Sequence, residues 1–241
     1  MISYRNIHKA FDIPVLRGVD LAVETGEMFA LFGPSGTGKS VLLKTTLSLI
    51  VPDVGDVEVD GLSVYHGPAS NLETIRRKIG YVFQHAALFD SLNVYENVSM
   101  GLPEDEIARM KTADLSRRVW EALEIVNLDP REILSKLPSE LSGGMKKRVG
   151  MARAIIGRPE ILLWDEPTTG LDPINTAAVE RLIQRLSKDL EVTSLLVTHD
   201  VEGGLHICDR VAMLHSGTLR FCGTPQEFKD SPDPVVQAFV D

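Results

Sequence analysis

Eight residues near the start of the chain have the types and spacing of a phosphate-binding loop. They fit the pattern G-x-x-x-x-G-K-[ST] in full, as Gly33-Pro34-Ser35-Gly36-Thr37-Gly38-Lys39-Ser40. In such a loop the main-chain N–H groups surround the phosphates, the lysine bridges the β- and γ-phosphates, and the last hydroxyl ligates Mg²⁺. A chance glycine-rich turn is the alternative, but an apolar run precedes this loop and a helical pattern follows it. The motif therefore predicts a nucleoside triphosphate bound together with Mg²⁺.

Two adjacent carboxylates, Asp165 and Glu166, follow the apolar run 161–164. A carboxylate at the carboxyl end of a buried strand can hold Mg²⁺ through water, which is the role predicted for Asp165. Glu166, one residue further on, can polarise a water for in-line attack on a γ-phosphate. The alternative is a solvated strand end that caps the next turn. Beside a complete phosphate-binding loop, we favour the catalytic interpretation.

Three further residues are candidates for contact with the nucleotide. Gln84 and His199 each end an apolar strand pattern, and strand ends of a parallel sheet face the ligand crevice. Gln84 can contact Mg²⁺ or the attacking water, and His199 can hydrogen-bond the γ-phosphate, although a structural role is open for both. Phe11 precedes the loop and is either an adenine-stacking ring or a core aromatic.

A second anion-binding pattern occurs more than a hundred residues downstream, at Ser142-Gly143-Gly144. Small residues at a helix start expose main-chain N–H groups, and the helix dipole adds positive potential there. The basic residues that follow are usually a solvated helix face; they are Lys146, Lys147, Arg148 and Arg153.

The elements that must position these residues alternate between strands and helices. Buried strands are expected at 27–32, 79–83, 161–164 and 193–198, and helices at 41–50 and 173–190. This alternation predicts an α/β fold with a mostly parallel sheet. Two hairpins are expected around Asp60-Gly61 and Ser216-Gly217. The segment from about 92 to 159 is rich in helix formers and indicates an inserted helical lobe. Gly203-Gly204 falls inside an expected helix, where paired glycines have no evident reason.

Composition limits the class of protein. The 241 residues are 44% hydrophobic and 24% charged, with a net charge of −9, which argues against nucleic-acid binding driven by charge. The two cysteines, Cys208 and Cys222, lack metal-ligand spacing and are expected to be reduced thiols. No apolar leader follows Met1, and no run reaches the ~18 apolar residues of a membrane span. We expect a cytoplasmic protein that contacts a membrane only through partners.

The order and spacing of these motifs resemble those of an ABC-transporter ATPase subunit over essentially the whole chain. The motifs are the phosphate-binding loop, Gln84, Leu141-Ser142-Gly143-Gly144, Asp165-Glu166, Gly170-Leu171-Asp172 and His199. The resemblance implies a single ABC ATPase domain over residues 1–241. Its P-loop NTPase (RecA-like) core, with an antiparallel β subdomain, would span 1–84 and 160–241, and an inserted α-helical subdomain would span 85–159.

The resemblance also implies roles for single residues. In that family two subunits enclose two ATP molecules head to tail, so Ser142, Gly143 and Gly144 would contact the ATP of the opposite subunit. The two phosphate patterns in one chain would then serve two different nucleotides. Glu166 would be the general base, His199 the γ-phosphate sensor and Asp172 a dimer-interface residue. Gln84 would couple the Mg²⁺ site to a transmembrane partner.

Three stretches resemble the Mla-type ATPases of bacterial phospholipid trafficking: 88–94, 141–145 with Met145, and 165–173. This resemblance implies phospholipid transport between the inner and outer membranes. It also implies permease subunits, an MCE-domain lipid-binding protein, a small STAS-domain protein, and a location on the inner face of the inner membrane. Two alternatives stay open. The first is an importer or exporter ATPase for an amino acid, a metal chelate or a drug. The second, ranked lower, is a soluble ABC-type ATPase on nucleic acid or ribosomes, or a regulatory module.

Overall fold

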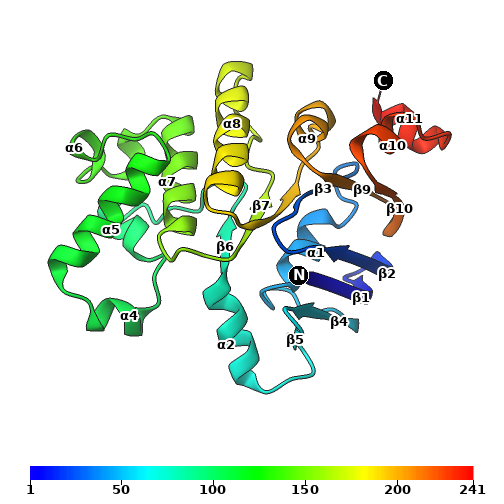
Figure 1. Cartoon of the computed structure of the whole chain (residues 1–241), viewed down its shortest axis with the longest axis horizontal. Coiled ribbons are helices and arrows are strands. Elements are labelled where there is room, and N and C mark those ends of the chain that lie inside the picture. The colour runs from blue at the N-terminus through cyan, green and yellow to red at the C-terminus, as the bar shows by residue number, and fades with distance from the viewer. Residues whose placement is uncertain (241) are drawn as a thin grey trace. The chain divides into compact units, whose positions relative to one another are not determined.

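The computed structural model of the protein describes residues 1–240, which form two compact units (Figure 1). The first unit combines Met1–Arg76 with the chain from Leu186 onward, and the second is Arg77–Arg185. The P-loop pattern and His199 belong to the first unit, whereas Gln84, Ser142 and Glu166 belong to the second.

An antiparallel sheet occupies the N-terminal part of the first unit, with strand order β2-β1-β4-β5. Its strands are β1 (Ile2–Ala10), β2 (Pro14–Val23), β4 (Val54–Val59) and β5 (Leu62–Ser63). Asp60 and Gly61 have φ values of 49° and 77°, which confirms the two-residue hairpin turn expected from their types. After β5, the Tyr65 hydroxyl donates to the carbonyl oxygens of Thr45, at the end of helix α1 (Lys39–Thr45), and of Ile50.

The parallel strands of the first unit carry its predicted site residues. Strand β3 (Met28–Phe32) lies between β8 (Thr193–Val197) and β9 (Arg210–His215), parallel to both, and β10 (Thr218–Gly223) pairs antiparallel with β9. Every residue of β3 and β8 is buried, as expected for strands covered on both faces. Since parallel strands end at the same edge, Gly33 and Thr198 leave the sheet on the same side.

The helices of the first unit are short. They are α1 (Lys39–Thr45), α9 (Val201–Ile207), α10 (Pro225–Lys229) and α11 (Pro234–Val240). Helix α1 ends five residues before the pattern predicts, and Ser48 is left-handed at φ 54°. Gly204 in α9 now has a reason: a Cβ there would lie 2.5 Å from the Phe32 ring. The glycine lets α9 pack directly on the end of β3.

The second unit has two parallel strands and most of the helices. The strands are β6 (Ile79–Val82) and β7 (Ile161–Asp165). The helices are α3 (Val94–Ser99), α4 (Glu104–Arg109), α5 (Thr112–Ile125), α6 (Pro130–Ile133), the 3-10 turn η1 (Pro138–Glu140) and α7 (Gly143–Ile155). Helices α2 (Ala69–Lys78) and α8 (Pro173–Asp189) each run across a boundary between the two units.

Helix α7 is the centre of packing in the second unit. It packs against α3, α5 and β6. Two glycines on neighbouring segments allow the main chain of α7 to lie very close to them. A Cβ on Gly80 would lie 2.3 Å from the Ala154 carbonyl oxygen, and a Cβ on Gly101 would lie 1.9 Å from the Arg153 carbonyl oxygen. Amphipathic α5 buries Val119, Ala122 and Leu123, as its spacing predicts. Within residues 1–240, no helix has the length and apolar character needed to cross a membrane.

Candidate functional site

The phosphate-binding loop follows strand β3 directly and depends on glycine at two positions. Gly33 has φ 148°, and a Cβ there would lie 2.2 Å from the Leu214 carbonyl oxygen at the end of β9. Gly38 has φ 100°, and a Cβ there would lie 2.7 Å from the Leu16 side chain. Because neither backbone angle nor space admits a larger residue, the loop conformation needs both glycines.

The Lys39 ammonium lies inside this loop. Lys39 is only 4% exposed, and its Nζ donates to the carbonyl oxygens of Gly33 at 2.7 Å and Pro34 at 3.0 Å. The Thr37 hydroxyl donates to the same Pro34 oxygen at 2.8 Å. The loop apex, Ser35 and Gly36, is exposed. The arrangement presents a buried positive charge beneath exposed main chain, which is what a triphosphate requires.

Phe11 is an exposed ring in the turn between β1 and β2, 59% accessible. The interpretation of Phe11 as a core aromatic is therefore wrong. The Lys9 ammonium lies 5.5 Å from the ring centroid and also pairs with Asp53 at 2.8 Å. This hydrogen bond from Lys9, with another from a main-chain N–H, lowers the pKa of the Asp53 carboxyl. An exposed ring held beside a fixed charge is available for stacking.

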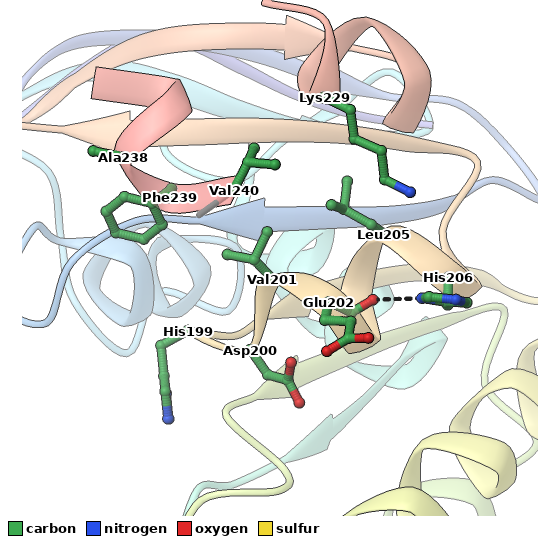
Figure 2. A pocket seen from close by; sticks show the side chains of 10 residues that line it. All are labelled: His199, Asp200, Val201, Glu202, Leu205, His206, Lys229, Ala238, Phe239 and Val240. Carbon is green, nitrogen blue, oxygen red and sulfur yellow. Dashed lines mark hydrogen bonds between the residues drawn. The ribbon is translucent and has the colours of Figure 1, made fainter. Parts of the chain in front are cut away.

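His199 is exposed and follows β8 by two residues. Asp200 accepts a hydrogen bond from the Gly203 N–H at 3.0 Å and so caps α9. Figure 2 shows His199 and Asp200 at one end of a pocket whose opposite wall comes from α11, including Phe239. In the same pocket wall, the His206 ring nitrogen pairs with the carbonyl oxygen of Glu202 within α9 (Figure 2).

In the second unit, Asp165 and Glu166 end strand β7. Asp165 is 2% exposed and accepts a hydrogen bond from the Tyr81 hydroxyl at 2.8 Å, so its interpretation as a solvated strand end is wrong. Glu166 has φ 46°, a left-handed conformation that costs a non-glycine residue about 1–2 kcal/mol. Backbone strain of this kind is concentrated at functional sites.

The structure brings Gln84 and Glu166 together, although 82 residues separate them in the chain. The Gln84 Nε2 donates to Glu166 Oε2 at 3.2 Å, and the Thr169 hydroxyl donates to the same oxygen at 2.9 Å. Two donors thus fix the Glu166 carboxylate. Thr169 was not among the predicted site residues; its spacing of three residues from Glu166 was the available signal.

The Ser-Gly-Gly pattern begins helix α7, as predicted. Ser142 is the N-cap, and its hydroxyl accepts from the Met145 N–H at 3.3 Å. Ser142 and Gly143 are exposed, and no atom lies within 4 Å of a Cβ placed on Gly143. A Cβ on Gly144 would lie 3.2 Å from Asn175 Oδ1. The Asn175 main-chain and side-chain nitrogens both donate to the Asp172 carboxylate, which lowers the pKa of that group.

Two of the basic residues on α7 are not a solvated face. Lys147 is 7% exposed and donates through Nζ to the Gln84 carbonyl oxygen. Arg153 donates to the carbonyl oxygens of Ala86 at 2.6 Å and Ala87 at 2.7 Å. The solvated interpretation is wrong for both. The sequence carried a signal for the burial of Lys147, because its helical spacing from Gly144 and Met151 puts all three residues on one face of the helix, which is buried.

The predicted Mg²⁺ ligands Ser40, Gln84 and Asp165 supply hydroxyl, amide and carboxylate oxygens, which suit this hard cation. Within residues 1–240, no group of three or more His, Cys, Asp and Glu side chains is placed to hold a metal ion.

Comparison with known proteins identifies the family. The family described as ABC transporter matches residues 16–169 of the chain, which include the phosphate-binding loop, Gln84, the Ser-Gly-Gly pattern and the Asp165-Glu166 pair. The chain belongs to the ABC transporter ATP-binding family. The predicted P-loop NTPase fold class is confirmed by solved ABC cassettes.

Solved structures similar to this ABC ATPase include the ATP-binding cassette MJ0796 in a dimeric post-hydrolysis state bound to ADP and Pi. It superposes with a TM-score of 0.83 at 31% identity and covers 93% of this chain and 99% of that one. The protein cbiO1 from Clostridium perfringens, part of the ABC transporter complex cbiONQ, superposes with a TM-score of 0.80 at 29% identity and covers 95% of this chain and 90% of that one. The family and these cassettes confirm that the chain is an ATP-hydrolysing enzyme.

Curated relatives of the ABC ATPase include transport proteins with different substrates. A methionine import ATP-binding protein of Pseudomonas fluorescens is 40% identical over 100% of this chain and 72% of its own length. The probable ribonucleotide transport ATP-binding protein mkl of Mycobacterium leprae is 38% identical over 99% and 68%. A sulfate/thiosulfate import protein of Methylococcus capsulatus is 39% identical over 99% and 68%.

Proposed function

We propose that this ABC ATPase works as a homodimer that powers a membrane transporter through permease subunits. The observation that carries the proposal is the pair of phosphate patterns. One has a buried lysine inside a glycine loop, and the other has an exposed, uncovered Gly143 at the start of α7. The second pattern would serve the nucleotide of a second copy. The dimeric form of the similar cassette MJ0796 supports a pair of subunits.

The proposed reaction is in-line hydrolysis of ATP. The residues 33–40 bind the triphosphate, with Lys39 against the β- and γ-phosphates, and Phe11 stacks on adenine. Glu166 accepts a proton from the attacking water, whose oxygen bonds to the γ-phosphorus while the bond to the β–γ bridging oxygen breaks and ADP leaves. His199 hydrogen-bonds the γ-phosphate.

Mg²⁺, held by Ser40, Asp165 and Gln84, neutralises phosphate charge when it is bound. The Gln84 side chain, already bonded to Glu166, is suited to orient the attacking water. Ser142, Gly143 and Gly144 complete the site of the opposite subunit.

Import of a small solute is better supported than transport of phospholipid. Two of the three named relatives are import proteins, for methionine and for sulfate or thiosulfate, which matches the importer alternative. Phospholipid transport of the Mla type, with MCE-domain and STAS-domain partners, depends on Met145 and the two other stretches and is the second candidate. Either function places the chain at the cytoplasmic face of a membrane through its permease.

Two variants test the ATPase roles. Glu166→Gln should bind ATP, turn over at least ~100-fold more slowly and accumulate as a dimer, because general-base catalysis contributes on the order of 10²–10⁴. Lys39→Ala should lose nucleotide affinity or turnover, whereas Lys188→Ala, which changes an exposed lysine of α8, should behave as wild type. Turnover by Glu166→Gln at the wild-type rate would remove Glu166 from the base role.

Identifying the transported substrate requires the intact transporter. The chain is purified from membranes with its permease, reconstituted in proteoliposomes, and assayed for ATP turnover with methionine, with sulfate and with labelled phospholipid in the bilayer. Stimulation by a small solute supports the importer. Stimulation and movement of phospholipid alone would reverse the order of the two candidates.

A further inference from the structure

The side chain of Lys147 is the one feature of α7 that neither nucleotide binding nor helix packing explains. A buried ammonium is costly unless it is paired, and Lys147 is 7% exposed. Its neighbours on the buried face are apolar or glycine, such as Gly144 and Met151. A methionine or leucine would fill this space without the cost of desolvation. The charge therefore needs a reason in what it contacts.

Lys147 is linked to the proposed base Glu166 through Gln84. Its Nζ donates to the Gln84 main-chain carbonyl oxygen, and the Gln84 side chain donates to Glu166 at 3.2 Å. Burial lowers the pKa of the Lys147 ammonium, and the negative charge of Glu166 acts in the opposite sense. These two hydrogen bonds connect the lysine through Gln84 to the carboxylate.

The lysine also ties these residues to the start of its own helix. Lys147 lies one helical turn after Gly143, whose uncovered main chain is proposed to meet the ATP of the opposite subunit. Arg153, further along α7, holds the carbonyls of Ala86 and Ala87 on the same loop. Helix α7 therefore holds the loop after Gln84 through two basic side chains, and the Lys147 bond goes to the residue whose side chain donates to Glu166.

We propose that Lys147 is a positioning residue: its ammonium fixes Gln84 and, through Gln84, the Glu166 carboxylate, so that the helix beginning at Ser142 controls the base of its own subunit's ATP site. Nucleotide contact at one site would then bias hydrolysis at the other. This inference rests on the proposed function, since it assumes the roles of Glu166 and of residues 142–144.

The test compares three variants of the full chain: Lys147→Met, Lys147→Arg and, as a matched control on the same helix, Lys146→Met. Methionine keeps an unbranched stem but removes the donor and the charge. For Lys147→Met we expect an unchanged or higher melting temperature, a KM for ATP within about twofold of wild type, and a kcat lowered about tenfold or more, as for a misplaced base. Lys147→Arg should recover most of kcat, and Lys146→Met should match wild type.

A second measurement separates positioning from a structural role. In a Glu166→Gln background, Lys147→Met should still form the ATP-bound dimer with the affinity of Glu166→Gln alone, because the lysine acts on hydrolysis. Loss of that dimer would show that Lys147 only supports the shape of α7 and would overturn the proposal. So would a wild-type kcat in Lys147→Met. If Lys147→Met does not fold, Lys147→Leu, which likewise removes the donor and the charge, takes its place with the same expected loss of kcat.

Failure of the proposed function gives a different result. If Glu166→Gln itself keeps wild-type turnover, the base assignment fails whatever Lys147 does. If Glu166→Gln is inactive and Lys147→Met is fully active, only the positioning role fails.

Discussion

At the scale of single residues, two kinds of glycine position differ in this chain. Gly33 and Gly38 are fixed by the fold, because left-handed angles and neighbouring atoms exclude any side chain. Gly143 lies outside the left-handed region, and among residues 1–240 no atom beyond its chain neighbours and its own helix backbone lies within 4 Å of its missing Cβ. Under the proposed function, glycine at this position would leave room for the ATP of a second copy.

This contrast gives a prediction for Gly143→Ala. Alanine favours helix over glycine by about 0.8–1 kcal/mol in a helix interior and by less at its first position, so the melting temperature should stay level or rise slightly. The added methyl should obstruct the approach of the γ-phosphate and weaken the ATP-dependent dimer about tenfold or more. Thermal unfolding and light scattering in the Glu166→Gln background measure the two effects. Undiminished dimer affinity would exclude close phosphate contact at this position.

Residue roles were predictable where a motif fixes both type and spacing. The loop 33–40 and the pair Asp165-Glu166 could be placed from the sequence, and both lie at strand ends. The exposure of Phe11 could not, because it depends on tertiary packing that residue type does not report. The reason for Gly204 likewise lies in tertiary packing, since a Cβ there would meet the Phe32 ring.

At the scale of elements, the second unit is organised by the close approach of α7 to its neighbours. The patterns predicted the buried strands β3, β6, β7 and β8 and the helix α8 to within one residue at each end, since apolar runs and turn residues mark their ends. Helix α1 is the exception: apolar Leu47 and Ile50 continue the helical spacing, but the chain turns after Thr45 and Ser48 becomes left-handed. Leu47 is buried outside the helix.

The close approach of α7 predicts a strong effect of Gly101→Ala. The added Cβ would lie 1.9 Å from the Arg153 oxygen, so the backbone must shift, and such overpacking costs about 1–3 kcal/mol or more. For a chain of this size each kcal/mol corresponds to roughly 2–4 °C in melting temperature. Gly157→Ala is the matched control, since its Cβ would lie an ordinary 3.7 Å from the nearest atom. Equal melting temperatures for the two variants would contradict the packing described for α7.

At the scale of the whole molecule, the proposed function depends on two copies that would meet near Asp172. Ile174 is 82% exposed although it is a large apolar residue, and it follows Asp172 at the start of α8. The proposed interface role of Asp172 would bring this apolar side chain into the contact between the two copies.

We therefore predict that Ile174→Asp weakens the ATP-bound dimer about tenfold or more while leaving the melting temperature of the monomer unchanged. A charge placed in an apolar contact must be desolvated without a partner. Val51→Asp, at an exposed position of the first unit, is the control and should dimerise normally. Sedimentation of both variants with ATP in the Glu166→Gln background makes the comparison. Normal dimerisation of Ile174→Asp would place the contact elsewhere.

The loop held by Arg153 has a consequence for engineering the protein. Ala86 and Ala87 are both left-handed, with φ 59° and 47°, an arrangement that alanine adopts at a cost of about 1–2 kcal/mol per residue. Exposed Ala87 has no packing role to lose, so Ala87→Gly should relieve that cost and raise the melting temperature by a few degrees. The loop between Gln84 and Phe89 can thus be stabilised by the single substitution Ala87→Gly, which alters no proposed nucleotide contact.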